Sequence, residues 1–211
     1  MKITLKAYQR YNKQLLKAEE QERQIEDQEV LKAFLGQDDK TINELPEKFI
    51  TQSLEDIYKF LSKESREFKS VIKHNGITYG FIPNLDSITY GENTDLVNYI
   101  SNWDTMHRAM SVMYRPVKKN WLGRVKVSNG QYEIEKYTST SNADDFLDID
   151  ADIVLGAMVF FYNLTNELLR AIPSFLEKQV MNQELMSSLP NGVNMQSYID
   201  SLKETSQSMK R

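Results

Sequence analysis

The chain of 211 residues contains no cysteine, two histidines, and few of the residues that interrupt regular structure. The lack of cysteine excludes disulfides, thiol catalysis and the zinc or iron–sulfur sites that thiolates build. His74 and His107 have no second histidine or carboxylate at ligand spacing on their own elements. With 8 glycines and 5 prolines, long structured elements should outweigh loops. These shortages favour a soluble, mainly helical protein that is not an enzyme.

Long hydrophobic runs are also lacking. The longest apolar stretch, Ile153 to Tyr162, covers about half of the ~20 residues that a membrane-spanning helix needs. The N-terminus carries Lys2 and Lys6 but no apolar core of the kind that a signal peptide has. We therefore expect no contact with a membrane and a chain that stays in the cytosol where it is made. A net charge of −4 argues against a protein that coats nucleic acid with its whole surface.

The first third of the chain has a helical pattern. Residues 1–35 contain no glycine or proline, and we expect one long helix, or two helices that meet near Gln21. Gly36 fits a helix C-cap. Residues 41–44 have the spacing of a capping box, and apolar residues at helical spacing predict a further helix over 46–62.

The middle of the chain changes to a pattern of short strands between helices. Asn75-Gly76 and Asn129-Gly130 each lie between alternating apolar runs, which predicts two β-hairpins because both central residues of the favoured turn need positive φ. Thr89 and Glu92 have the spacing of a capping box. A second helix holds residues 106–114 and should stop before Arg115-Pro116, since the residue before proline disfavours helix.

The third major helix is expected from Asp150 to Ala171, with apolar residues nearly all round it between Ile153 and Tyr162. Such a helix would be the central element of the fold. The predicted fold class is therefore mainly α, of the α+β type, with a long central apolar helix and two small β-hairpins. We divide the chain into an N-terminal helical region (1–66), a hairpin-plus-helix core (67–185) and a C-terminal loop, short helix and polar tail (186–211), which together form one domain.

An acidic stretch invites a calcium interpretation. Asp148, Asp150 and Asp152 have the alternating spacing of the first ligands in an EF-hand loop. That loop needs glycine at its sixth position and glutamate at its twelfth, where this chain has Ile153 and Val159. Carboxylates at a helix N-terminus, where the helix dipole favours negative charge, explain the stretch better. We expect no metal and no cofactor.

One segment is locally basic and includes a tryptophan. A loop of this kind could contact DNA phosphates, and nucleic acid would be a partner only through this patch. The favoured alternative is a solvated hairpin flank. The candidate phosphate-contact residues are Arg115, Lys118, Lys119, Trp121, Arg124 and Lys126.

A second group of candidates consists of methionines and aromatic residues. Methionine fills irregular gaps in cores and also suits adaptable partner surfaces. Core packing is the default interpretation, whereas an aromatic cluster facing several sides of one helix suggests a subunit contact. The candidate interface residues are Met106, Met110, Met113, Phe160, Phe161 and Tyr162.

Four blocks of the sequence resemble a known family. Residues 3–11 are similar to the recurrent opening ITLGQYQKY, and residues 79–92, 103–116 and 154–169 are similar to three further blocks of the same proteins. The family is that of morphogenesis proteins encoded by tailed bacteriophages, found in phages of Bacteroidetes-type hosts that include the crAss-like phages. The chain departs from the family pattern at Lys6-Ala7 and at Asn93 to Leu96, which affects local turns rather than membership.

The resemblance implies a non-enzymatic structural or assembly protein of the virion, at the head–tail junction or in the tail. Its partners would be other phage structural proteins and further copies of itself, and it would occupy the host cytoplasm during assembly and then the virion. One alternative is a transient tail-assembly chaperone that is absent from the mature particle, with the methionine-rich faces as its client site. A more remote alternative is a hydrolase that uses paired carboxylates.

Overall fold

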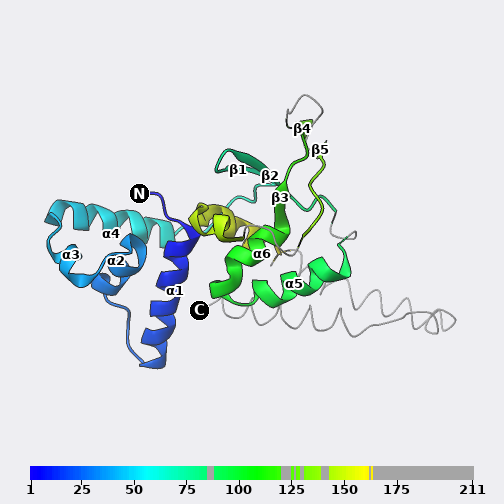
Figure 1. Cartoon of the computed structure of the whole chain (residues 1–211). Helices are drawn as coiled ribbons and strands as arrows, with labels where there is room; N and C mark the ends of the chain where they lie inside the picture. Colours follow the sequence, from blue (N-terminus) through cyan, green and yellow to red (C-terminus); the bar gives the residue numbers. More distant parts are fainter. Residues whose placement is uncertain are drawn as a thin grey trace.

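The computed structural model describes residues 1–84, 88–119, 125, 127–128, 131–138, 143–161 and 163. It shows a mixed α+β chain, mainly helical, with a small antiparallel sheet. Four N-terminal helices lie on one side of the molecule, and the sheet with two further helices lies on the other (Figure 1). Within the described residues, no helix has the length and apolar character needed to cross a bilayer.

The N-terminal helices are α1 (Leu5–Glu20), α2 (Asp27–Leu35), α3 (Asp39–Asn43) and α4 (Glu47–Leu61). Of the two alternatives for the first segment, the structure shows two helices, with Gln21 as the C-cap of α1. Gly36 ends α2 in the left-handed conformation with φ 68°, which confirms the predicted C-cap. The capping box predicted at residues 41–44 is wrong: α3 has already begun, and Asp38 is its N-cap, accepting the Thr41 N–H at 2.8 Å.

The sheet has three antiparallel strands in the order β1 (Val71–His74), β2 (Ile77–Phe81) and β3 (Tyr114–Pro116). Asn75 and Gly76 both have positive φ, 48° and 75°, and so confirm the first hairpin. The second hairpin is confirmed by the pairing of β4 (Val127–Ser128) with β5 (Gln131–Tyr132), although residues 129–130 of its turn lie outside the described residues. The sequence did not predict β3, which pairs with β2 across a long stretch of chain.

Between the hairpins lie α5 (Tyr90–Ile100), the short 3-10 turn η2 (Trp103–Thr105) and α6 (Met106–Met113), and a second 3-10 turn, η3 (Ala143–Asp148), follows the second hairpin. The predicted capping box of α5 is confirmed: the Thr89 N–H donates to Glu92 Oε2 at 2.7 Å, and the Glu92 N–H donates to Thr89 Oγ1 at 3.3 Å. The helix α6 ends before Arg115-Pro116, as the sequence predicts.

The long apolar helix expected from Asp150 to Ala171 is not found in the described part of the chain. Residues 151–161 are helical, and residues 162 and 164–171 lie outside the described set. The described turns are not buried all round, because Val159 is 41% exposed and Asp152 forms ion pairs. Apolar composition alone therefore overstated the burial of this helix: its buried residues follow one face, while Val159 faces outward.

The interior consists of two clusters of buried side chains. The smaller one joins the N-terminal helices and consists of Ile3, Ala7, Val30, Leu31, Phe34, Ile42, Ile57 and Ala151. The larger one joins the sheet to α5, α6 and the helix of residues 151–161, and its members include Leu5, Tyr79, Phe81, Met106, Met110, Met113, Tyr114, Val154 and Phe161. We call the four N-terminal helices around the smaller cluster the N-terminal layer. We call the sheet, α5, α6 and the helix of residues 151–161 around the larger cluster the body. Leu5 contributes to the body cluster and Ala7 to the layer cluster, so α1 contacts both.

Candidate functional site

The N-terminal layer meets the body along a backbone seam. Thr4 and Asp150 form an isolated antiparallel bridge. The Leu5 N–H donates to the Ile149 carbonyl at 2.9 Å, and the Ala151 N–H donates to the Ile3 carbonyl at 2.9 Å. The seam therefore fixes the start of α1 against the start of the helix of residues 151–161.

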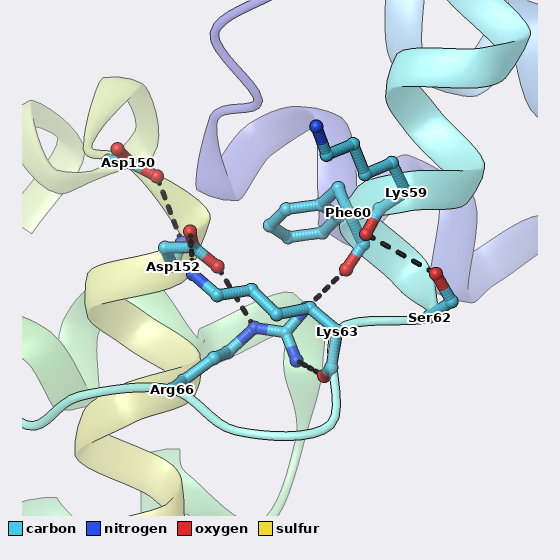
Figure 2. A network of polar contacts seen from close by, with 7 residues as sticks. All are labelled: Lys59, Phe60, Ser62, Lys63, Arg66, Asp150 and Asp152. Atoms are coloured by element: carbon cyan, nitrogen blue, oxygen red, sulfur yellow. Dashed lines mark hydrogen bonds and ion pairs between the residues drawn. The ribbon is translucent and has the colours of Figure 1, made fainter.

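Next to the seam, an ionic network joins the segment after α4 to the start of the helix of residues 151–161 (Figure 2). The carboxylate of Asp152 accepts from Lys63 Nζ at 2.7 Å and from Arg66 Nε at 3.0 Å. The remaining nitrogens of Arg66 donate to the carbonyls of Phe60 and Lys63, at 2.6 and 2.8 Å, and its guanidinium lies 4.8 Å from the centroid of the Phe60 ring. Burial alone would raise the pKa of Asp152, but the charges of Lys63 and Arg66 outweigh it and hold this pKa below its ordinary value.

A hollow of about 520 Å³ opens beside this network. It is lined by cationic side chains, acidic side chains and the Phe60 ring, and the residues that carry charge are Lys2, Lys59, Lys63, Asp56, Asp150 and Asp152. Side chains of both signs therefore line this hollow, and the carboxylate of Asp152 is already paired with Lys63 and Arg66.

The acidic stretch serves the start of a helix, in agreement with the favoured interpretation. Asp150 Oδ1 accepts the Asp152 N–H at 2.9 Å, and the carboxylate of Asp152 turns to Lys63 and Arg66. Within the part of the chain that the structure describes, no group of three or more histidine, aspartate or glutamate side chains could hold a metal ion.

The structure places most of the candidate interface residues in the core of the body. Met106, Met110, Met113 and Phe161 are at most 1% exposed. Phe160 is half-buried and stacks on Phe68, with ring centroids 4.3 Å apart. Tyr162 lies outside the described residues. The three methionines of α6 therefore follow the default interpretation and pack in the core. In the helix of residues 151–161, the exposed apolar side chain is that of Val159.

The basic candidates are brought together only in part. Arg115 is not a free cation, because its Nη1 donates to Glu92 Oε1 at 2.5 Å. Lys118 pairs with Glu133 at 3.1 Å, and Lys119 is exposed. Trp121, Arg124 and Lys126 lie outside the described residues. In the described part of the patch, neighbouring carboxylates thus neutralise two of the three cations that were expected to contact phosphate.

Sequence reasoning missed the most buried charged pair in the described residues, Glu92 with Arg115. The two side chains are 5% and 11% exposed, and the same Glu92 carboxylate also caps α5. Burial alone would raise the pKa of Glu92, but the Thr89 backbone and hydroxyl and the Arg115 charge hold it below its ordinary value. The capping box located Glu92, but no local signal paired it with an arginine 23 residues later.

A second pocket, of about 200 Å³, lies between the sheet, α6 and η3. Tyr79, Tyr114 and Phe146 contribute aromatic walls, and Tyr137 covers one side with its hydroxyl hydrogen-bonded to Asp95 at 2.5 Å. Burial raises the pKa of Tyr137, and the bond to Asp95 raises it further. This tyrosine therefore stays protonated at neutral pH and holds residues 135–138 against α5.

Comparisons of this chain with family models, with curated proteins and with solved structures gave no match.

Proposed function

We propose that this chain is a structural or assembly protein of a tailed bacteriophage, which acts through contacts with other virion proteins at the head–tail junction or in the tail. It would be present in the host cytoplasm during assembly and then in the virion. The proposal rests on the resemblance of four sequence blocks to phage morphogenesis proteins, and on what those blocks do in the structure.

The observation that carries the proposal is that the four blocks interlock. Gln9 of the first block donates from Nε2 to the Trp103 carbonyl of the third at 2.6 Å. Glu92 of the second pairs with Arg115 of the third. The ring centroids of Phe81 and Phe161, from the second and fourth blocks, are 5.7 Å apart. The resemblance thus falls on residues that together build one scaffold, and not on a single isolated segment.

The glycines of these blocks support the same interpretation. A Cβ added at Gly80 would lie 2.4 Å from the Tyr132 ring, and one at Gly156 would lie 2.4 Å from the Glu67 carbonyl oxygen. Both positions allow another part of the chain to approach closely. Their requirement for glycine is therefore explained by packing, without recourse to a bound substrate.

The outer face of the helix of residues 151–161 is the part of the body that best suits a protein contact. Val159 is 41% exposed, and it lies one turn from the half-buried Leu155, whereas the ring of Phe160 packs inward on Phe68 and Phe81. Apolar side chains grouped in this way can be covered when a partner or a second copy binds. We place the candidate contact there rather than on Met106, Met110 and Met113, which are buried.

The alternative, a transient tail-assembly chaperone, receives less support from the structure. Its client site was expected on the methionine-rich faces, and Met106, Met110, Met113 and Met158 of these faces lie in the core, while Met181, Met186 and Met195 lie outside the described residues. Mass spectrometry of purified virions separates the two functions. Stoichiometric presence in virions supports the structural role, whereas abundance in infected lysate together with absence from virions supports the chaperone.

A matched pair of variants tests the contact itself. Val159→Glu and Ile77→Glu change side chains that are exposed to similar extents, 41% and 40%. Both variants should fold, but only Val159→Glu should weaken incorporation into particles or self-association, measured by co-sedimentation and analytical ultracentrifugation. Equal incorporation of the two variants would place the contact elsewhere, and absence of the chain from both virions and phage-protein complexes would overturn the proposed function.

A further inference from the structure

The two histidines of the chain hydrogen-bond in different ways. His74 is 8% exposed, and its Nε2 lies 2.7 Å from the Asp145 carbonyl oxygen. A carbonyl only accepts, so Nε2 of His74 donates, and it can do so in both the neutral and the charged imidazole. His107 on α6 instead has its Nδ1 3.4 Å from Nε2 of Gln9 on α1.

The contacts of Gln9 determine which atom donates to His107. Gln9 Nε2 lies 2.6 Å from the Trp103 carbonyl oxygen and 3.4 Å from the Asp104 carbonyl oxygen. These acceptors require the amide nitrogen, and not the amide oxygen, at this position. One N–H of Gln9 donates to the Trp103 carbonyl, and the second lies between the Asp104 carbonyl and Nδ1 of His107. Nδ1 of the neutral ring then accepts from this second N–H. The ring proton of the neutral imidazole is then on Nε2, 3.8 Å from Asp144 Oδ1.

We propose that His107 and Gln9 form a pH-sensitive latch between the N-terminal layer and the body. A proton added to Nδ1 of His107 places an N–H group opposite the second N–H of Gln9. Two donors then face each other at a contact that is 8% exposed at Gln9. Acidification therefore weakens the attachment of α1 to α6 and η2, and leaves the His74 contact intact.

The charged groups around His107 set the direction of the effect. Burial lowers the pKa of His107, Arg108 on the same helix lowers it further, and Asp144 on η3 partly opposes them, as does Asp104 through its backbone. From α1, the group that faces the ring is the uncharged Gln9. The side chain of Asp144 is 91% exposed, so solvent screens its attraction for an imidazolium.

The lowered pKa of His107 determines how the stability of the contact depends on pH. Because the folded pKa of His107 lies below the value of 6.5 for an unperturbed histidine, the neutral ring is the form that the folded state favours. Its contribution to stability is complete above about pH 6.5 and is lost as the pH falls toward the folded pKa. The latch is therefore closed at neutral pH and opens in mild acid.

Native-state hydrogen exchange on the full chain tests the latch, with rates corrected for the pH dependence of intrinsic exchange. Between about pH 7.5 and pH 5, the protection of α1 amides should fall roughly fivefold, the order expected for the loss of one hydrogen bond, while amides of β2 stay protected. His107→Asn keeps an acceptor near the position of Nδ1 and cannot titrate, so it should abolish the step. His74→Gln should leave the step in place.

A second measurement keeps the proposal testable if a variant does not fold. In NMR spectra of the wild-type chain, the side-chain amide signals of Gln9 should shift with the same midpoint as the ring of His107. A pH step that persists in His107→Asn would overturn the latch. So would Gln9 amide signals that stay constant while His107 titrates.

Discussion

The N-terminal layer and the body are stabilised in different ways. In the layer, the ion pairs Arg23–Glu29 and Lys32–Asp39 lie at the surface. In the body, the pair Glu92–Arg115 is buried beside a core of aromatic and methionine side chains. Exposed pairs contribute little to stability, whereas removal of one partner of a buried pair leaves an uncompensated charge. The burial of an ion pair, and not its presence, therefore decides how much its loss costs in each part of the chain.

The largest effect is expected from Arg115→Met, which leaves the Glu92 carboxylate buried without its counter-ion. The loss should be about 3–5 kcal/mol of unfolding free energy, with a fall in Tm of roughly 10 °C. Chemical denaturation followed by circular dichroism measures it. The double variant Glu92→Gln with Arg115→Met should recover part of the loss, because no buried charge remains.

The same pair also predicts a dependence on pH. The folded pKa of Glu92 lies below the ordinary value of 4.5, so the carboxylate contributes stability above about pH 4.5 and loses it as the pH falls through the folded pKa. Glu92→Gln should flatten this part of the acid profile. An unchanged acid profile in that variant would show that the pair is not the source of the effect.

A second comparison concerns neighbouring phenylalanines of the body. Phe161 is 1% exposed, and Phe161→Ala should cost about 3 kcal/mol or more because it opens a cavity in the core. Phe160 is half-buried and packs on Phe68 and Phe81, so Phe160→Ala should also lower stability, but by less than Phe161→Ala. Thermal melts of the two variants measure the difference. Equal melting temperatures for both variants would contradict this assignment.

A smaller effect is expected at the first hairpin. Gly76 has φ 75° with open space around its Cα, so Gly76→Val is strained by its backbone conformation alone. The cost should be about 1 kcal/mol or more, measured by urea denaturation. Gly91→Val is a useful contrast, since Gly91 also has open space but no positive φ. If Gly91→Val lost as much unfolding free energy as Gly76→Val, the positive φ of the turn would not be the cause of the loss.

The smallest effect is expected in the N-terminal layer, from Arg23→Ala. The paired side chain of Glu29 has its pKa lowered to about 2, first through its hydrogen bond with Arg23. The two side chains are 36% and 24% exposed, so solvent screens the pair and little unfolding free energy is lost when it is broken. We expect a Tm that is unchanged within error. A fall in Tm close to that of Arg115→Met would show that the exposed pair of the layer matters as much as the buried pair of the body.

The sequence predicted the features that depend on neighbours along the chain. Asn75-Gly76 sets its own turn, and Thr89 with Glu92 makes its own cap, because the interacting groups are within three residues. Gly36 likewise ends α2 through its own backbone freedom. The false capping box at Thr41 has a local cause as well, since Asp38 lies three residues earlier and competes for the same position.

The features that the sequence missed join distant residues. The seam pairs Thr4 with Asp150, and Arg115 reaches Glu92 from another element. No spacing rule connects such positions. The apolar run from Ile153 to Tyr162 was misleading for the same reason: which of its sides is buried depends on contacts such as that of Phe160 with Phe68, which come from elsewhere in the chain.

The body is one tightly packed unit, and the N-terminal layer is attached to it along the seam between Thr4 and Asp150. Native-state hydrogen exchange under increasing denaturant measures this directly. Amides of β2 and α6 should exchange only through global unfolding, and amides of α2 and α4 should exchange through a smaller opening of lower free energy. Identical opening free energies in both parts, with the same dependence on denaturant, would show a single cooperative unit and would contradict the claim.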